Sequence, residues 1–420
     1  MNGFHCGAAE RTRWLWLSLS GGAVLLAATA HQPARGQQLP FQGPPSRQEV
    51  RRWVNNLPAE GRKEAIRAFY EQYGAKMAEG LARQRHYQLP AEVDDDTHGF
   101  LFKRTPQREL NVFVDYPGDW KRTDRRPAIV FWHGGGFTQG NAGQFFAQAN
   151  YFAARGAVCF RPEYRIRDLD GTMPHAAIED GISAMRWIKK NADRFGIDPE
   201  RIAAGGGSAG GCMAAVMGTV DAEKMAAAGF VGRDDDRAIS PRPAAMILYN
   251  PFVDFFEPLN IRHLEEEALM SGEDPEDYRE LYHAISAIEN LNEDSPPSII
   301  LFGTRDAFYP QQIRWIVKCR ELGLTVRDYV YKNEVHSWYN NSPHLEYTTE
   351  NVDKFLVEIG LLEAEPKVEP PHKPISPGRA GIQKEKYDRK TDWDEQQRFR
   401  RYAEEHQINV IPFKHDEEER

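Results

Sequence analysis

Residues 203–211 read Ala-Ala-Gly-Gly-Gly-Ser-Ala-Gly-Gly, and they frame Ser208 in the pattern G-x-S-x-G. This pattern is typical of a nucleophile elbow, in which a strand ends, the serine adopts a strained backbone conformation and a helix begins at once. Gly206 and Gly210 leave room for such a sharp reversal. The first amides of the helix would face any negative charge that develops beside the serine oxygen. A glycine-rich loop before any helix has a similar composition, so the interpretation depends on partners elsewhere in the chain.

Short strands alternate with helices around this stretch. The expected strands are 99–103, 109–116, 128–132, 157–160, 201–204, 244–249, 298–302 and 325–331. Apolar residues at three- and four-residue spacing predict helices at 144–154, from Pro174 to a stop at Gly196, and at 347–359. This alternation indicates an α/β fold with a mostly parallel central sheet and helices on both faces. Functional groups of such sheets gather at the carboxyl ends of the strands.

A second glycine-rich segment, residues 133–136 (HGGG), follows the strand expected at 128–132. Glycine amides have no side chain to obstruct them, so they can stabilise an oxyanion, at about 3 kcal/mol for each donor. We expect the amides of Gly135, Gly136 and Ala209 to form such an oxyanion hole; a flexible turn is the alternative. His133 is expected to brace the loop and is also a candidate for the substrate pocket.

A serine nucleophile requires a general base and a carboxylate that orients the base. In a strand–turn–helix arrangement the chain order is serine, acid, histidine. Asp306 follows the strand at 298–302, and His336 follows the strand that ends near 331. Both candidates therefore appear in the required order after Ser208.

Other acids and bases compete for these roles. Asp254 follows the strand at 244–249, and Glu334 lies two residues before His336. The alternative bases, which lie within or beside expected helices, are His263, His283 and His344. We prefer Asp306 and His336 because both follow strand ends, while the other two acids remain alternatives.

These segments resemble the α/β-hydrolase fold and, within it, the hormone-sensitive lipase-like esterases. The blocks that carry the resemblance are 133–137 (HGGGF), 164–188 (YRIRDLDGTMPHAAIEDGISAMRWI), 206–211 (GGSAGG) and 303–310 (GTRDAFYP), followed by His336. The resemblance covers roughly residues 98–362. It implies a serine esterase with Ser208 as nucleophile, a triad completed by Asp306 and His336, and a helical cap over the substrate.

The chain departs from the family pattern at two places. Members commonly have an aspartate before the block at 164, where this chain has Arg161, Pro162 and Glu163, so the shape of the acyl pocket is open. Ser337 and then Trp338 follow His336 where a glycine is usual. Trp338 either lines the substrate pocket or packs in the core.

The chain has 420 residues, of which 41% are hydrophobic and 27% charged, and these values are typical of a soluble globular protein. Its net charge of -9 argues against nucleic acid as a partner. Cys159, Cys212 and Cys319 have no metal-ligand spacing, and the expected chemistry requires neither a metal nor an organic cofactor. The oligomeric state is open.

The expected organisation has four parts. Residues 1–30 contain Arg11 and Arg13, an apolar run and a small-residue end, and they resemble a signal peptide for export to the periplasm or beyond; a retained anchor is the alternative. After cleavage no stable membrane span is expected. Residues 31–97 are a spacer and helices that could form a cap. The catalytic domain is expected at 98–362, with a helical insertion near 255–291. A charged, proline-containing, flexible tail is expected at 363–420, and its residues 408–411 could dock on the domain.

The function predicted from these features is an exported carboxylic ester hydrolase that acts on short acyl esters, either small molecules or esters on a polysaccharide. An amidase or peptidase of the same fold would use the same residues, and a hydrolase-fold binding protein without catalysis is a third alternative.

Overall fold

The computed structural model describes residues 99–256, apart from 228, 230, 231, 233 and 234, and residues 279–373. It also describes residues 401, 403–408, 410 and 411, and positions 40, 53, 72 and 264. The expected signal peptide, nearly all of the expected N-terminal helices, the centre of the expected insertion and most of the tail lie outside the described residues. The helical cap is therefore still a prediction.

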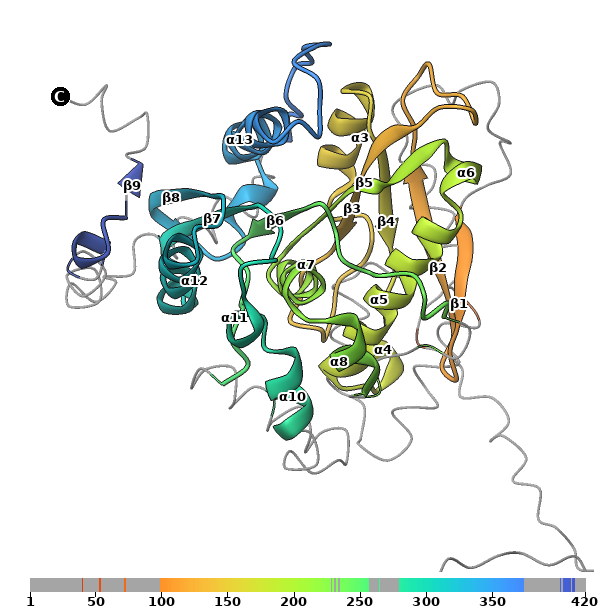
Figure 1. Ribbon diagram of the computed structural model, residues 1–420, viewed down its shortest axis with the longest axis horizontal. Coiled ribbons are helices and arrows are strands. Elements are labelled where there is room, and N and C mark those ends of the chain that lie inside the picture. Colours follow the sequence, from red (N-terminus) through yellow and green to blue (C-terminus); the bar gives the residue numbers. More distant parts are fainter. Residues whose placement is uncertain are drawn as a thin grey trace, which may run out of the picture. The chain divides into compact units, whose positions relative to one another are not determined.

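A nine-stranded sheet forms the centre of the domain, in the order β1-β2-β4-β3-β5-β6-β7-β8-β9 (Figure 1). The strands are β1 (Phe100–Arg104), β2 (Glu109–Asp115), β3 (Arg126–Trp132), β4 (Val158–Pro162), β5 (Ile197–Gly207), β6 (Ala245–Tyr249), β7 (Ser298–Arg305), β8 (Val326–Val335) and β9 (Val410–Ile411). Only the β1–β2 and β2–β4 pairings are antiparallel among the pairs of this sheet. The structure thus confirms the α/β fold class with its mostly parallel sheet.

Helices cover both faces of the sheet (Figure 1). The larger ones are α5 (Pro174–Lys190), α7 (Ala209–Thr219) and α12 (Tyr309–Glu321) on one face, and α3 (Phe146–Ala154) and α13 (His344–Glu358) on the other. The shorter ones are α4 (Arg167–Asp170), α6 (Ala192–Phe195), α8 (Ala222–Ala227), α10 (Arg279–Ile285), α11 (Ala287–Asn290) and the 3₁₀ helix η2 (Trp338–Asn340). Alternate residues of β3 enter opposite cores: Val130 packs with α5 and α7, and Phe131 packs with α3. Both faces of the central strands are therefore apolar, as a doubly covered sheet requires.

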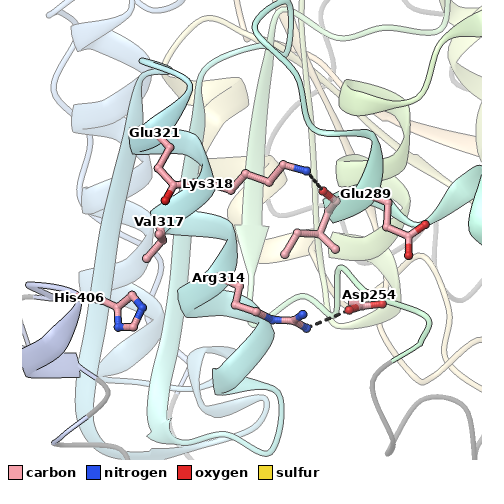
Figure 2. A pocket seen from close by; sticks show the side chains of 8 residues that line it. Asp254, Glu289, Arg314, Val317, Lys318, Glu321 and His406 are labelled. Carbon is pink, nitrogen blue, oxygen red and sulfur yellow. Dashed lines mark hydrogen bonds and ion pairs between the residues drawn. The ribbon is translucent and has the colours of Figure 1, made fainter.

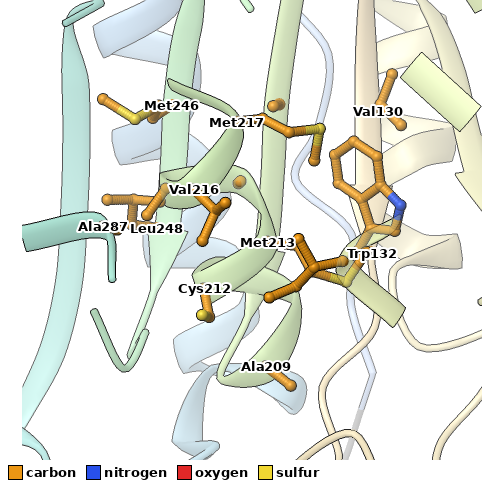
Figure 3. Packing of buried hydrophobic residues seen from close by; sticks show 14 of the residues in the cluster. Val130, Trp132, Ala209, Cys212, Met213, Val216, Met217, Met246, Leu248 and Ala287 are labelled. Atoms are coloured by element: carbon orange, nitrogen blue, oxygen red, sulfur yellow. The ribbon is translucent and has the colours of Figure 1, made fainter. Parts of the chain in front are cut away.

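The helix that follows Ser208 is buried on all sides. All residues of α7 are buried, and Figure 3 shows its side chains between Trp132 of β3 and Leu248 of β6. Burial on every side is typical of a central helix that has no polar face to present to solvent. This packing holds the start of α7 in place beside β5.

One expected helix is interrupted. The sequence predicted a single helix from Pro174 to Gly196, but α5 ends at Lys190 and α6 forms a separate turn. Asn191, between them, donates a hydrogen bond from Nδ2 to the Trp187 carbonyl at 2.8 Å, and such local bonds compete with helix continuation. Gly196 ends α6 at a φ of 59°, as the sequence predicted, and a Cβ there would lie 2.5 Å from the Lys121 carbonyl oxygen.

Part of the C-terminal tail joins the sheet. Val410 and Ile411 form β9, which pairs in parallel with Val330 and Tyr331 of β8. Ile408 is buried in the same core as α7 and α12. Among the described residues, no helix combines the length and the apolar character that a membrane crossing needs.

Candidate active site

Ser208 lies in a sharp turn between β5 and α7. Its φ of 54° and ψ of -116° fall outside the regions that a serine ordinarily adopts, at a cost of about 1–3 kcal/mol. The Ser208 N–H donates to the Tyr249 carbonyl of β6 at 2.9 Å, which helps to hold this conformation. The residue has the backbone geometry of a nucleophile elbow.

The backbone of β3 explains the two framing glycines. A Cβ built on Gly206 would lie 2.5 Å from the Trp132 carbonyl oxygen, and one built on Gly210 would overlap the same oxygen. Both contacts are with backbone, which cannot move aside as the end of a flexible side chain can. The pattern G-x-S-x-G is therefore required by the close approach of β3 to the turn.

Three strand ends bring a hydroxyl, an imidazole and a carboxylate together. His336, at the end of β8, lies with its Nε2 2.9 Å from Ser208 Oγ and its Nδ1 2.9 Å from Asp306 Oδ2. Asp306 follows β7 and is 1% exposed, and its Oδ1 accepts the Phe308 N–H at 2.9 Å. A carboxylate can only accept, so the proton of a neutral His336 is on Nδ1, and Nε2 is left to accept the Ser208 hydroxyl proton.

The competing acids have other partners. Asp254 Oδ2 accepts a hydrogen bond from Arg314 at 2.9 Å, at the edge of a pocket of about 430 Å³ between α11 and α12 (Figure 2). Glu334 Oε1 lies 3.2 Å from His344 Nε2. The carboxylate that the structure places against His336 is Asp306.

The competing bases are also accounted for where they are described. His344 pairs with Glu334, and His283 stacks on Phe256 with the ring centroids 3.6 Å apart. His263 lies outside the described residues. Of the candidate bases in the described ranges, His336 is the one that contacts Ser208.

The HGGG segment lies against Ser208. A Cβ built on Gly134 would be 3.3 Å from Ser208 Cβ. Gly135 and Gly136 have φ values of 121° and 62°, and the Gly135 carbonyl accepts the Thr138 N–H at 3.1 Å, so the loop is a defined turn. Ala209 is the first residue of α7, where an N–H has no carbonyl acceptor within the helix. These amides are consistent with the predicted oxyanion hole.

His133 packs against this loop and supports it. Its buried ring stacks on Tyr164 with the centroids 4.1 Å apart, and its Nδ1 lies 2.8 Å from the Gly134 carbonyl oxygen. Tyr164 donates its hydroxyl proton to the His133 carbonyl at 2.6 Å. Burial holds the pKa of Tyr164 well above its usual range, so the phenol stays a donor. A bracing role agrees with these contacts better than a place in the substrate pocket.

Comparison with known proteins shows the family. A family model described as BD-FAE matches residues 116–314, which include Ser208 and Asp306. A propionate-bound esterase from the Planctomycetes species Thermogutta terrifontis is 30% identical, with a TM-score of 0.56, over 64% of this chain and 96% of that chain. The apo form of Thermogutta terrifontis esterase 2 is 30% identical, with a TM-score of 0.56, over 67% of this chain and 100% of that chain. The chain belongs to the α/β-hydrolase serine esterases.

Within the α/β-hydrolase esterases, the curated relatives confirm the resemblance to the hormone-sensitive lipase-like kind. Esterase LipC from Mycobacterium tuberculosis (strain ATCC 25618 / H37Rv) is 29% identical over 242 residues, which are 51% of this chain and 55% of that protein. Carboxylesterase NlhH from the same strain is 38% identical over 96 residues, which are 22% of this chain and 29% of that protein. The chain spans about half the length of the first curated relatives that it matches.

Aromatic rings lie beside the histidine of this α/β-hydrolase esterase. Phe308 meets the His336 ring edge-on at 5.2 Å, and Phe252 lies 5.9 Å from Phe308. Phe137, which follows the HGGG segment, meets Phe252 at 5.7 Å. Phe308 thus places an apolar ring next to His336, and Phe252 and Phe137 continue this apolar group into the core.

Trp338 packs elsewhere. Its ring lies 4.4 Å from Tyr331 and 5.2 Å from His344, and the residue is 1% exposed. These contacts belong to the core under α13. They support the packing alternative for Trp338 and give no support to a place in the substrate pocket.

Sequence reasoning missed Asn250, the residue after β6. Its side chain is buried, and its Nδ2 lies 3.0 Å from His336 Nδ1 and 3.1 Å from His336 Nε2. Its φ of 33° is a left-handed value that asparagine tolerates better than most residues. The signal in the sequence was a polar residue directly after an apolar strand, in the same position at which Ser208 and Asp306 were noticed.

Proposed function

We propose that this chain is a serine carboxylic ester hydrolase that uses Ser208, His336 and Asp306 as its triad. The observation that carries the proposal is the pair of 2.9 Å contacts that join Asp306 to His336 and His336 to Ser208. The esterase names of its relatives and structural neighbours support the same class of reaction.

In the first half of the reaction, His336 Nε2 takes the proton of Ser208 as Oγ attacks the ester carbonyl carbon. The carbonyl oxygen becomes an oxyanion beside the amides of Gly135, Gly136 and Ala209. Asp306 orients the ring and stabilises the imidazolium. The tetrahedral intermediate then expels the alcohol, which takes the proton from His336, and an acyl-serine is left.

In the second half, water repeats the sequence. His336 takes a proton from the water as its oxygen attacks the acyl carbon, and the same amides bind the second oxyanion. Collapse breaks the bond to Ser208 Oγ, which regains its proton from His336. The products are a carboxylic acid and the free enzyme.

The preferred substrates in this proposal are short acyl esters. The apolar ring of Phe308 next to His336 supports an acyl group with little polarity. Similar structures of the Thermogutta terrifontis esterase hold propionate or butyrate, both short acids. We extend the proposal to an exported enzyme that removes acyl groups from a polysaccharide, and the apolar segment at 14–30 is what supports export.

The triad is tested with p-nitrophenyl esters of increasing acyl length and with a diethyl phosphate label. One of the similar structures is Thermogutta terrifontis esterase 2 phosphorylated by paraoxon, so paraoxon is a suitable probe. We expect hydrolysis that is fastest with short chains, and a diethylphosphoryl group on Ser208 by mass spectrometry. Ser208→Ala should abolish both, whereas Ser240→Ala, at an exposed serine, should change neither. Hydrolysis that persisted in Ser208→Ala would remove Ser208 from the mechanism.

The finer points need separate measurements. An amidase would cleave an aminoacyl p-nitroanilide at least as well as the matching ester, and that result would replace ester hydrolysis as the main activity. Release of acetate from an acetylated polysaccharide tests the polymer substrate, and its absence beside hydrolysis of p-nitrophenyl acetate would overturn that part. N-terminal sequencing of the mature protein from cell fractions tests export.

A further inference from the structure

Gln144 makes three hydrogen bonds with the two ends of its amide. Its Oε1 accepts the Gly134 N–H at 2.5 Å, and its Nε2 donates to Tyr339 Oη at 3.2 Å and to Asn340 Oδ1 at 3.1 Å. The Gly134 N–H can only donate, so it must face the amide oxygen. The same orientation turns the NH₂ group toward two oxygens, and all three contacts agree on how the amide lies.

The two ends of this side chain reach different parts of the site. Gly134 belongs to the HGGG segment, whose backbone lies against Ser208. Tyr339 and Asn340 lie in η2, which begins two residues after His336. The Tyr339 hydroxyl also rests on the Gly207 backbone, because a Cβ built on Gly207 would overlap it.

The sheet joins these two loops only indirectly. The HGGG segment follows β3 and the His336 loop follows β8, and β5, β6 and β7 lie between these strands in the sheet. β3 and β8 are not hydrogen-bonded to each other, so the sheet relates their loops only through the three strands between them, and the Gln144 side chain adds a direct link. The Gln144 amide spans the gap with an acceptor for one loop and a donor for the other.

Tyr339, at the other end of the Gln144 connection, does not change its protonation state near neutral pH. Burial raises the pKa of Tyr339 far above its usual range, and the nearby negative charge of Asp306 adds to the increase. The phenol therefore stays neutral at and around neutral pH. A neutral phenol oxygen is a constant acceptor for Gln144.

We propose that Gln144 is a positioning residue that ties the HGGG segment to the His336 loop, so that the oxyanion amides and the general base keep one spacing around Ser208. The inference rests on the proposed esterase function. The oxyanion and the leaving oxygen are attached to the same carbon. The amides that bind the first and the histidine that protonates the second must therefore be in position at the same time. Loss of the connection lowers transition-state binding more than substrate binding.

The test compares Gln144→Met, which keeps the length of the side chain and removes all three hydrogen bonds, with Gln407→Met, the same change at an exposed residue outside both loops. We expect kcat of Gln144→Met to fall by at least about tenfold while KM changes by less than about threefold. The affinity for a phenyl trifluoromethyl ketone, which forms an oxyanion adduct with serine, should fall in proportion to kcat/KM. Gln407→Met should behave as the wild type. A folded Gln144→Met with unchanged kcat overturns the proposal, and so does an equal loss of affinity for the ketone and for the product acid.

A double-mutant cycle keeps the proposal falsifiable if one variant is unstable. Tyr339→Phe removes one acceptor of Gln144. If both residues act through the same connection, the double variant loses no more kcat than Gln144→Met alone. Losses that multiply would mean that the two residues act independently, and this result overturns the connection.

Hydrogen exchange separates failure of this inference from failure of the proposed function. Peptides that cover 133–145 and 336–345 should both exchange faster in Gln144→Met than in the wild type, whether or not the wild type hydrolyses esters. If the wild type proves inactive while both peptides still exchange faster in Gln144→Met, that result supports the connection and rejects the esterase function. Unchanged exchange in the 336–345 peptide would reject the connection alone.

Discussion

Asn250 Nδ2 lies 3.0 Å from one ring nitrogen of His336 and 3.1 Å from the other. An atom in the ring plane at such distances from both nitrogens would overlap the carbon between them, so the amide lies over the face of the imidazole. The in-plane directions remain for Ser208 and Asp306. Asn250 Oδ1 is buried and has no hydrogen-bond partner among the described residues.

A carboxylate at this position should change how the activity depends on pH. In Asn250→Asp, a negative charge over the ring stabilises the imidazolium relative to the neutral imidazole. The reaction needs neutral His336, so the acid limb of kcat/KM should move to higher pH. The profile is measured from about pH 5 to pH 9 with a short p-nitrophenyl ester. Asn333→Asp, at an exposed asparagine that also has a left-handed φ, of 65°, is the matched control. An unmoved acid limb in Asn250→Asp would mean that the amide has no electrostatic contact with the ring.

The three candidate acids should differ widely in their effect on activity. Asp306→Asn keeps the shape of the side chain but cannot hold the His336 tautomer, and we expect kcat to fall by about 10³- to 10⁴-fold. Glu334→Gln and Asp254→Asn should retain kcat to within about tenfold, because these carboxylates pair with His344 and Arg314. Steady-state kinetics on one ester decide between them. If Glu334→Gln were as damaging as Asp306→Asn, the acid would have been assigned to the wrong strand end.

His344 should make the stability of the domain depend on pH. Burial lowers the pKa of His344 to about 4 from an ordinary value of 6.5, against the opposing charge of Glu346. Glu334, at 3.2 Å, also faces the ring and opposes the decrease. Between these two pKa values the unfolded chain binds a proton that the folded chain does not, so stability is complete above about pH 6.5 and is lost as the pH falls toward 4.

The measurement is urea unfolding at several pH values in this window. We expect His344→Gln, whose amide can still donate to Glu334, to remove a slope of about 1 kcal/mol per pH unit from the free energy of unfolding. His372→Gln is the control, because 70% of that side chain is exposed. Equal slopes in wild type and His344→Gln would show that His344 titrates alike in both states.

The docked part of the tail should contribute to stability and not to catalysis. Ile408 is 8% exposed and packs in the core that contains α7 and α12. Ile408→Ala should lower the free energy of unfolding by about 2 kcal/mol and leave kcat at room temperature unchanged. Glu405→Ala, at an exposed position of the same segment, controls for changes in the tail itself. A loss of kcat in folded Ile408→Ala would connect the tail to the active site.

The sequence by itself determined the class of fold and the chemical parts of the candidate site. Alternating strands and helices predict a parallel sheet because their apolar periodicity is local. Ser208 was found because an elbow needs small residues at fixed offsets, and Asp306 and His336 were found because a parallel sheet collects the carboxyl ends of its strands at one edge. The helix break at Asn191 was missed because a side-chain bond to a nearby carbonyl competes with helix continuation without disturbing the apolar stripe.

Only the tertiary structure decided how these parts meet. Asp254, Asp306 and Glu334 all lie at strand ends, and the order β6-β7-β8 together with the local partners Arg314 and His344 determines which carboxylate reaches His336. Asn250 lies over the imidazole, and Gln144 joins loops from two strands that have three others between them in the sheet. Such contacts depend on the folding of distant segments against one another. No periodicity or spacing along the chain reveals them, because an asparagine or glutamine in a sequence does not indicate which residue its amide will contact.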